Sequence, residues 1–356
     1  MGVVLINYLG WRDTVECLES LLRVPTPQMV IVVCDNGSTD DSLARIRDWA
    51  AGRLQATSSP SRVVNQLTQP PIEKPITLLE RTSATLSKVS VASLPQRAVL
   101  LVANGNNLGF AGGNNVALRW FATQAEVTHV WLLNNDTVVT PDALAAMLRR
   151  LETKPSAGIC GARLLYYHAP ETVQTRGGLR YQRWLGLSKA VGAFRPAQEA
   201  INSEIIERQL DMIHGSCMLV TRRFLASVGP LAEDYFLYGE EIDWATRAER
   251  CGFTMAYADD AMIYHKEGAV IGTSADPRRR SVVSDFYAVR SRLRFAIKFF
   301  PYTLPTVYLG LILVILNRLR RGQLKRALMV IRLVLQPSSY RAHSGREPPH
   351  QERGWL

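Results

Sequence analysis

The stretch that decides the fold is His129–Thr140, which reads HVWLLNNDTVVT. Its apolar run, Val130–Leu133, is typical of a short strand that is buried on both faces of a parallel sheet. The run ends abruptly in the polar residues Asn134–Asp136, and a helix is predicted directly afterwards, over Ala143–Leu151. A buried strand followed by an amphipathic helix indicates an α/β domain.

The polar residues at the end of this strand are candidates for metal binding. In open α/β sheets, ligands bind beside the carboxyl ends of the strands. A carboxylate such as Asp136, presented there by a rigid strand, suits a hard divalent cation, Mg²⁺ or Mn²⁺. The alternative interpretation is that Asn-Asn-Asp only forms a turn, which these residue types favour.

The rest of the chain supplies the other elements of such a domain. It opens in the order β-α-β-α, the pattern of a parallel sheet with right-handed crossovers. Strands are predicted at Val3–Ile6, Met29–Val33, Ala98–Ala103, Ala157–Tyr166, Cys217–Val220, Phe253–Ala258 and Ala261–Tyr264, and helices at Asp13–Leu22, Thr39–Ala50, Val116–Thr123 and Glu240–Cys251.

Polar residues end four of the predicted strands, at Asn7, Asp35, Asn134–Asp136 and His265. Because the carboxyl ends of parallel strands meet at one edge of the sheet, we expect these residues to lie along one rim. Asp35 would accept a hydrogen bond there from a base N–H or a ribose hydroxyl, unless it only starts a turn. His265, near an aspartate, is a candidate metal ligand, although a lone histidine is usually structural.

A loop rich in glycine and asparagine, Asn104–Asn115, precedes the predicted helix Val116–Thr123. Its backbone N–H groups and the start of the helix would suit a diphosphate. The loop lacks the G-K-[ST] ending of a Walker A motif and the spacing of GxGxxG, so the pattern alone is unspecific.

Three carboxylates, Glu240, Glu241 and Asp243, crowd the start of another predicted helix. The helix dipole stabilises negative charge at this end, which would explain them without any chemistry. The competing interpretation is a general base, a carboxylate held near a hydroxyl nucleophile.

Two segments are predicted to lack regular structure. Residues 51–97 contain five prolines, many serines and threonines and no aromatic residue, so they predict a partly disordered low-complexity insertion that contributes little core. Residues 172–192 resemble a loop, and an aromatic set, Tyr181, Trp184 and Phe194, lies in or beside it.

The net charge of +11 belongs to the C-terminal part of the chain. From Arg278 onward, 16 lysines and arginines stand against 3 acidic residues, whereas residues 1–277 are nearly neutral. A nearly neutral main domain argues against nucleic-acid binding. The five cysteines form no CxxC pair, which predicts buried thiols and a reducing, cytoplasmic location.

The C-terminal part contains a 19-residue stretch without charge, Phe299–Asn317. A spanning helix needs roughly 20 apolar residues, and Pro301 and Pro305 make this one marginal. Basic amphipathic segments flank it, which favours an in-plane or re-entrant attachment to anionic lipid over a spanning helix. The alternative is a buried helix pair. The predicted organisation is a main domain over 1–277, membrane-associated helices over 278–340 and a disordered tail over 341–356.

The motifs taken together resemble a known family. They are, in order along the chain, INYLGW, VVCDNGSTDDS, NNLGFAGGNN, LLNNDT, HGSCMLVTRR, YGEEIDWATRAERCG and YHKEGA. This set is similar to the family-2 glycosyltransferases and, more narrowly, to their rhamnosyltransferase-like branch, which acts in bacterial polysaccharide assembly. The resemblance runs from about Val3 to His265, outside the 51–97 segment. It implies the GT-A fold, a nucleotide-binding parallel sheet merged with an acceptor-binding half.

The resemblance also assigns roles to residues. The segment Asn134–Asp136 takes the place of the family's DxD motif, so Asp136 would be the main carboxylate ligand. The family's base is the aspartate of a Glu-Asp pair, and Glu241 occupies that position here, with Glu240 and Asp243 as alternates. The implied sets are Asn7, Tyr8, Asp35, Asn36, Asn107, Gly109, Gly112, Gly113 and Asn135 for the nucleotide-sugar, Gly215, Ser216 and Tyr238 for the acceptor, and Asp136, His265 and Asn134 for the metal.

The implied reaction is an inverting sugar transfer from a dTDP- or UDP-sugar to a hydroxyl of a lipid-linked or polysaccharide acceptor, and the resemblance suggests rhamnose as the sugar. A divalent metal stabilises the departing diphosphate, and a carboxylate takes the proton of the acceptor. The enzyme would be peripheral or monotopic on the inner face of the cell membrane. Two rivals are a catalytically inactive GT-A scaffold and a nucleotidyltransferase; the latter would need a basic Gly-rich loop near the N-terminus, which is absent.

Overall fold

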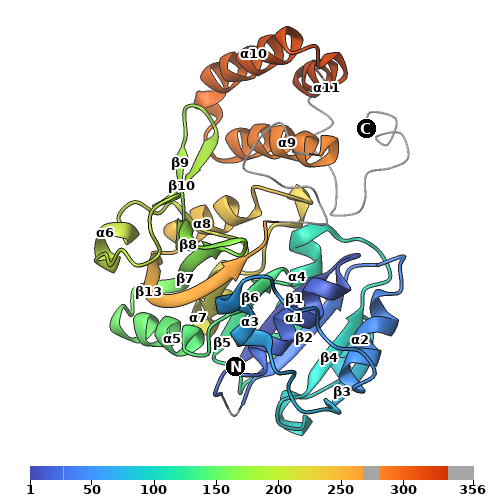
Figure 1. Cartoon of the computed structure of the whole chain (residues 1–356). Helices are drawn as coiled ribbons and strands as arrows, with labels where there is room; N and C mark the ends of the chain where they lie inside the picture. Colours follow the sequence, from blue (N-terminus) through green and yellow to red (C-terminus); the bar gives the residue numbers. More distant parts are fainter. Residues whose placement is uncertain (27, 268–280, 336–356) are drawn as a thin grey trace.

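The structure is a computed structural model that describes residues 1–26, 28–267 and 281–335 (Figure 1). The predicted tail over 341–356 and the predicted boundary between 277 and 278 lie outside these residues. The described chain forms a mixed α/β domain with a layer of three C-terminal helices above it (Figure 1).

A ten-stranded sheet forms the centre of the domain, in the order β3-β4-β2-β1-β5-β12-β7-β13-β6, with β8 paired to β7. Strand β12 runs antiparallel to both β5 and β7, so β5 and β7 point the same way. Most other pairs are parallel, as the β-α-β-α order predicts. The strands are β1 Gly2–Asn7, β2 Val30–Asp35, β3 Leu78–Thr82, β4 Val99–Ala103, β5 His129–Asn134, β6 Thr137–Val139, β7 Ala157–Tyr166, β8 Ala169–Arg176, β12 Cys217–Thr221 and β13 Thr254–His265.

Helices cover both faces of this sheet, because successive strand residues point to opposite sides. In β1, Val3 packs into the core under α1, α2 and α5, and Val4 packs into the core under α4, α7 and α8. These helices are α1 Trp11–Leu21, α2 Ser42–Ala50, α4 Gly109–Thr123, α5 Ala143–Thr153, α7 Arg222–Val228 and α8 Glu240–Arg250. The strand ends Asn7, Asp35, Asn134 and His265 therefore share one edge of the sheet.

Residues 51–97 differ from the prediction. They form α3 (Arg62–Thr68), β3 and two short 3₁₀ turns, η1 (Leu86–Lys88) and η2 (Val91–Ser93), and Val64 and Leu86 are buried. Strand β3 extends the sheet as an edge strand, in parallel register with β4. Its side chains are largely exposed, so backbone pairing rather than an apolar pattern holds it, and the composition of the segment gives no sign of a strand.

Residues 172–192 are also more regular than predicted. They include most of β8, then β9 (Gly178–Gln182) and β10 (Leu187–Ala190), which form a second sheet with β11 (Met212–Ile213). The two strands predicted at Phe253–Ala258 and Ala261–Tyr264 are one strand, β13, with a register shift between Ala258 and Met262. Helix α6 spans Ser203–Glu207.

The C-terminal layer comprises α9 (Val282–Phe299), the 3₁₀ turn η4 (Pro301–Thr303), α10 (Leu304–Arg320) and α11 (Leu324–Leu335). Asp285 on α9 pairs with Arg318 and Arg326, which ties the three helices together. Within the described residues, Pro301–Arg320 is the one helical segment long and apolar enough to cross a membrane.

Helix α9 also contacts the main domain, over the 3₁₀ turn η3 (Glu233–Tyr235) and the loop that follows it. Ser291 Oγ donates to the carbonyl of Leu237 at 3.0 Å, and Phe295 packs with Tyr235. Lys298 Nζ donates to the buried carboxylate of Asp243 at 2.5 Å. This helix therefore supports the segment that leads into α8, in addition to holding the layer above it.

Candidate active site

The end of β1 lies within a buried hydrogen-bond network. Asn7 Nδ2 donates to Asp35 Oδ1 at 2.7 Å, and Asn7 Oδ1 accepts from Thr14 Oγ1 at 2.8 Å. Asn135 Nδ2 donates to the same threonine hydroxyl at 2.9 Å, which links the end of β5 to the end of β1. The network fixes three of the residues predicted to bind the nucleotide-sugar relative to one another. Tyr8, the next residue of the predicted set, is half-buried beside them.

The carboxylate of Asp35 is held from a second side by Ser38. The Ser38 backbone N–H donates to Oδ2 at 3.0 Å and its hydroxyl donates to Oδ1 at 2.6 Å. Together with Asn7 this makes three donors for a group that offers about four acceptor positions. Asp35 is thus oriented rigidly and keeps capacity for about one further donor.

Asn36 organises the Gly- and Asn-rich segment. Its Nδ2 donates to Asn107 Oδ1 and to the Gly109 carbonyl, both at 3.0 Å. Helix α4 begins at Gly109, seven residues before the predicted start, so Gly112 and Gly113 are helical rather than part of a loop. A Cβ atom at position 113 would be tightly packed, 3.1 Å from Ile6 Cδ1 and 3.2 Å from Asn36 Oδ1, so the glycine eases the close approach of α4 to Asn36.

Two amides at the start of α4 already have partners. Gly109 N–H donates to Asn107 Oδ1 at 3.0 Å, and Phe110 N–H donates to the Phe236 carbonyl at 2.8 Å. The expectation that this helix start offers free N–H groups to a diphosphate therefore does not hold for its first two residues. Instead, the second bond joins α4 to the loop that leads into α8.

Asp136 and His265 meet at the rim, as predicted. His265 Nε2 lies 3.3 Å from Asp136 Oδ1, and both side chains are largely buried. The other ring nitrogen, Nδ1, lies 2.9 Å from Gln174 Oε1, and Gln174 Nε2 donates to Glu267 Oε1 at 3.0 Å. Because a carboxylate accepts hydrogen bonds, it fixes the orientation of the Gln174 amide, so His265 Nδ1 is the donor to Oε1. The neutral ring then presents the lone pair of Nε2 towards Asp136.

This arrangement fits a divalent cation. Nε2 is buried and makes no hydrogen bond with the part of the chain that the structure describes. Burial acts to lower the pKa of His265, but the carboxylate of Asp136 outweighs it and the pKa is raised, which shows that the pair attracts positive charge. Within the described ranges, no group of three or more His, Cys, Asp or Glu side chains is arranged so that it could hold a metal ion. Two protein ligands are nevertheless typical of Mg²⁺-like sites, in which substrate phosphates complete the coordination.

The third predicted metal ligand, Asn134, is the last residue of β5. Its backbone N–H donates to the Ser216 carbonyl at 2.9 Å, and its own carbonyl accepts from Thr137 Oγ1 at 2.7 Å. These bonds place it between the rim and the turn His214–Ser216. The role of Asn134 as a ligand stays a prediction.

The turn His214–Ser216, which contains two of the predicted acceptor residues, stands next to the rim. The rings of His214 and His265 lie 5.7 Å apart, edge to face. Burial and the neighbouring His265 lower the pKa of His214 to about 3, so this ring is neutral at physiological pH. Its Nδ1 lies 2.8 Å from Ser216 Oγ.

Glu241 lies against the same turn, since a side chain at Gly215 would collide with its carboxylate. Glu240 is buried beside it, and its Oε2 has no hydrogen-bond partner within the described chain. Burial raises the pKa of both carboxyls, and the charge of Glu241 raises that of Glu240 further. Raised pKa values in a pair of buried carboxyls are the property expected of a proton acceptor.

Asp243, the third carboxylate of this cluster, is bound differently. It is fully buried and accepts hydrogen bonds from Tyr235 OH at 3.0 Å, Arg247 Nε at 2.7 Å and Lys298 Nζ at 2.5 Å. The carboxylate is therefore already bonded to two cationic side chains and one hydroxyl. It anchors α8 to α9 and is unavailable to take a proton from the sugar acceptor. The hydroxyl of Tyr238, a predicted acceptor residue, likewise pairs with Ser284 on α9, at 2.7 Å.

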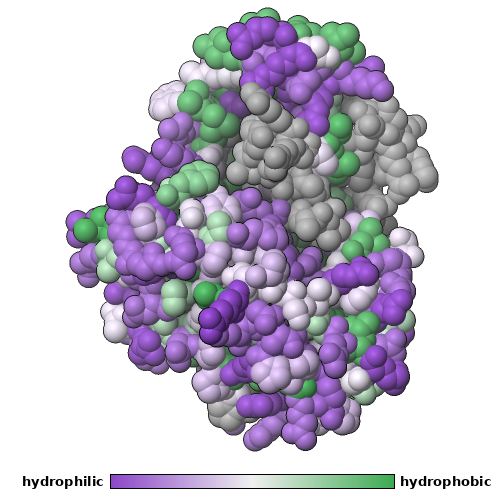
Figure 2. Space-filling view, in the orientation of Figure 1, coloured by the Kyte–Doolittle hydropathy of each residue, from purple (hydrophilic) through white to green (hydrophobic). Residues whose placement is uncertain are grey.

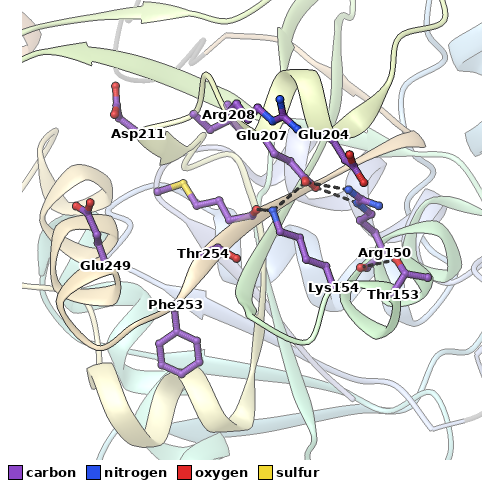
Figure 3. A pocket seen from close by; sticks show the side chains of 12 residues that line it. Arg150, Thr153, Lys154, Glu204, Glu207, Arg208, Asp211, Glu249, Phe253 and Thr254 are labelled. Carbon is purple, nitrogen blue, oxygen red and sulfur yellow. Dashed lines mark hydrogen bonds and ion pairs between the residues drawn. The ribbon is translucent and has the colours of Figure 1, made fainter.

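A surface pocket of about 530 Å³ lies elsewhere and contains none of the predicted site residues (Figure 3). It is lined by the end of α5, by α6 and by the start of β13, the strand whose other end carries His265. Over its twelve residues that strand spans on the order of 30 Å. At the centre of the pocket Glu207 is held by Arg150 and Lys154, a closed ion cluster rather than an open site (Figure 3).

Comparison with known proteins identifies the family. Residues 79–284 match the family model described as "Glycosyltransferase like family 2". The chain belongs to this family.

Two curated relatives of this family-2 glycosyltransferase are similar over part of their length. One is the low-salt glycan biosynthesis hexosyltransferase Agl10 of Haloferax volcanii, 28% identical over 150 residues, 41% of this chain and 45% of the relative. The other is the N-acetylglucosaminyl-diphospho-decaprenol L-rhamnosyltransferase of Mycobacterium tuberculosis, 24% identical over 225 residues, 58% of this chain and 70% of the relative. The chain thus spans less than half of the first relative.

Solved structures confirm the predicted fold. The crystal structure of GalNAc-T7 with UDP, GalNAc and Mn²⁺ superposes with a TM-score of 0.52 at 12% identity, over 86% of this chain and 49% of that one. At this identity the similarity shows a shared GT-A fold, the fold class that the sequence predicts.

Several residues of the site were not predicted from the sequence. Thr14 and Ser38 are hydrogen-bonded to Asn7 and Asp35, which are predicted to bind the nucleotide. Gln174, itself bonded to Glu267, orients the ring of His265. Ser38 lies within a quoted motif, but nothing in the local pattern distinguishes it from a helix cap. Gln174 lies 91 residues from His265 in the chain, in a segment with no recognisable pattern.

Proposed function

We propose that this chain transfers a sugar, with inversion, from a nucleotide-sugar to a hydroxyl of a lipid-linked glycan, using a divalent metal. The observation that carries the proposal is the Asp136–His265 pair on the sheet rim, next to the turn that Glu241 contacts. Family membership supports the reaction class. The Mn²⁺ and UDP of the GalNAc-T7 structure support the metal and the nucleotide donor.

Asp136 and His265 would hold the cation, with Asn134 as the predicted third ligand. When bound, a divalent ion neutralises charge that develops on the departing nucleoside diphosphate. Beside it lie the hydrogen-bonded side chains of Asn7, Asp35 and Asn135. The carboxylate of Asp35 would accept one further hydrogen bond, from the nucleoside. The donor's diphosphate would therefore lie between the β1–β2 rim and Asp136.

Glu241 would accept the proton of the acceptor hydroxyl as that oxygen attacks the sugar. One displacement on the face opposite the leaving group inverts the anomeric centre, so no nucleophile from the enzyme is required. The turn His214–Ser216 would position the acceptor between Glu241 and the rim. Neutral His214 adds no positive charge there that would compete for the carboxylate.

The name of the mycobacterial relative supports the finer assignment. That protein is an L-rhamnosyltransferase for N-acetylglucosaminyl-diphospho-decaprenol, which favours a deoxysugar such as rhamnose and a lipid-linked acceptor here. A lipid-linked acceptor requires access to the inner membrane surface. The apolar segment Pro301–Arg320 and its basic flanks would provide that attachment.

The test is replacement of the proposed base. Glu241→Gln keeps shape but removes the proton acceptor, so we expect transfer to fall by roughly 10²–10⁴-fold while Mn²⁺-dependent donor binding is retained. Glu241→Asp should keep substantial activity. In the parent, transfer should rise with pH through a value above the ordinary range of a glutamate, because the base acts deprotonated and its pKa is raised.

The rate of Glu240→Gln, measured beside it, distinguishes the two carboxylates. Parental transfer by Glu241→Gln together with loss in Glu240→Gln would move the base to Glu240. If the parent neither transfers nor hydrolyses any of a panel of nucleotide-sugars with Mn²⁺, the inactive scaffold becomes the better description.

A further inference from the structure

The β9–β10 hairpin ends in an exposed apolar tip. The exposed fractions of Trp184, Leu185 and Leu187 are 59%, 42% and 49%. Hairpin turns usually expose polar residues, since large apolar side chains gain nothing from contact with water. The tip belongs neither to the core nor to the candidate active site.

The tip is fixed against the C-terminal layer. The Trp184 carbonyl accepts a hydrogen bond from Thr306 Oγ1 at 2.5 Å, and its ring centroid lies 5.8 Å from that of Tyr302. The guanidinium of Arg183 lies 5.0 Å from the centre of the Phe300 ring. The hairpin therefore reaches up to the start of α10 and forms one surface with it (Figure 1).

Helix α10 continues the apolar surface. Leu309, Ile312, Leu313 and Leu316 are exposed at positions i, i+3, i+4 and i+7, so they form one stripe along the helix. The opposite side, with Val307 and Leu311, is buried against α9. Figure 2 shows exposed apolar residues beside hydrophilic ones at the top of the molecule, where this layer lies.

The charged residues around this apolar surface indicate which kind of partner it binds. Exposed Arg320, Arg321, Lys325 and Arg332 flank the apolar stripe and the exposed leucines of α11. Asp285 is the one acidic residue of the described range 281–335, and it is paired with Arg318 and Arg326. A second copy of the same face would bring like charges together, whereas anionic headgroups complement them. Trp and Tyr are also the side chains preferred at a membrane–water interface.

We propose that the hairpin tip and α10–α11 together form one surface that enters the headgroup region of an anionic lipid bilayer. The inference rests on the proposed membrane attachment and adds the hairpin to it. Strand β9 pairs with β11, with Gly178 opposite Ile213, and His214–Ser216 follows at once. The hairpin would therefore hold the acceptor turn at a fixed distance from the membrane that carries the lipid-linked acceptor.

The experiment is flotation of the full chain with vesicles of phosphatidylglycerol and phosphatidylcholine. The double variant Trp184→Ser, Leu187→Ser should lower the partition coefficient by about tenfold, because each side chain loses part of its transfer free energy. Leu313→Ser is the positive comparison on α10. Ile205→Ser is the matched control, since Ile205 is similarly exposed, at 52%, on α6. Hydrolysis of soluble donor should be unchanged in all of them.

The possible outcomes distinguish a role of the hairpin in membrane binding from membrane binding by α10 and α11 alone. Unchanged partition of the hairpin variant, with a loss in Leu313→Ser, would overturn the role of the hairpin and leave membrane attachment standing. Parental protein that does not float with anionic vesicles would overturn both, while donor hydrolysis still reports on the proposed transferase. A dimer that the hairpin variant converts to monomer would assign the surface to a second copy instead.

Discussion

The two ends of strand β13 hold two buried carboxylate sites that differ in one respect. Near the amino end, Glu207 accepts hydrogen bonds from Arg150 Nε at 2.9 Å, Lys154 Nζ at 2.8 Å and the Tyr257 backbone N–H at 2.8 Å. At the carboxyl end, His265 Nε2 faces Asp136 Oδ1 at 3.3 Å. The first carboxylate is neutralised by two cationic side chains, whereas the second faces a single histidine ring and the pair attracts positive charge.

The two sites also differ in the direction in which the pKa of a buried group is shifted. Burial acts to raise the pKa of Glu207, but hydrogen bonds from Arg150 and Lys154 outweigh it and the pKa is lowered. The carboxylate of Asp136 instead raises the pKa of His265 against burial. The pocket lies over the Glu207 cluster. An attraction for positive charge, rather than a concave surface, therefore marks the end of the strand where chemistry is expected.

The largest effect is expected at the end that carries Asp136 and His265. Asp136→Asn should lower sugar transfer by about 10³-fold, since several kcal/mol of charge stabilisation would be lost. Stabilisation of the protein by Mn²⁺ in thermal unfolding should disappear as well, while the melting temperature without metal should change little. Parental transfer by this variant in the presence of a chelator would contradict the metal role of the rim.

The end that carries Glu207 should respond in stability instead of activity. Glu207→Gln leaves Arg150 and Lys154 without their carboxylate, so we expect a loss of about 3–5 kcal/mol in the free energy of unfolding, measured with urea. Transfer by the folded fraction should persist. Glu204→Gln is the control, because Glu204 lines the same pocket but is exposed.

The pH dependence of this contribution has a definite sign. The folded pKa of Glu207 is lowered from the ordinary value of 4.5. The carboxylate therefore stabilises the fold at pH values above 4.5, and this stabilisation is lost as the pH falls through the folded pKa. The difference in urea midpoint between parent and Glu207→Gln should shrink in that acid range. An unchanged difference down to pH 3 would contradict the ion cluster.

A smaller effect should come from the group that orients His265. Gln174→Ala removes the acceptor of the Nδ1 proton, so we expect Mn²⁺ affinity to fall by about 10–100-fold in titration calorimetry. Gln198→Ala is the control, because Gln198 is exposed, and it should leave the affinity unchanged. Equal Mn²⁺ affinity in both variants would mean that the ring needs no support from Gln174.

The sequence predicted the rim but not what surrounds it, for a physical reason. Asp35, Asp136 and His265 each end an apolar run, and that pattern is local. Gln174 acts on His265, which is 91 residues away in the chain, from a segment that was predicted to be a loop. Contacts across such distances leave no mark on the pattern of either segment.

The same distinction explains why strand β3 and the packing partner of α9 were not predicted. Strand β3 is an edge strand with largely exposed side chains, so it lacks the apolar alternation on which strand prediction depends. Helix α9 showed the expected amphipathic pattern, but the pattern does not tell which surface its apolar side covers. That it covers the segment leading into α8 follows only from the folded contacts.

The contacts of α9 also set an order for the assembly of the chain during synthesis. Asp243 is completed by Lys298, which is 55 residues later in the chain. At about 5–20 residues per second, the ribosome needs roughly 3–11 s to cover that distance. During this interval the nucleotide-side strands β1, β2, β4 and β5 can already pair, whereas the start of α8 waits for its partner. The donor half is therefore the part of the nascent chain that can form first, and the contact of Asp243 with α9 can be completed only later.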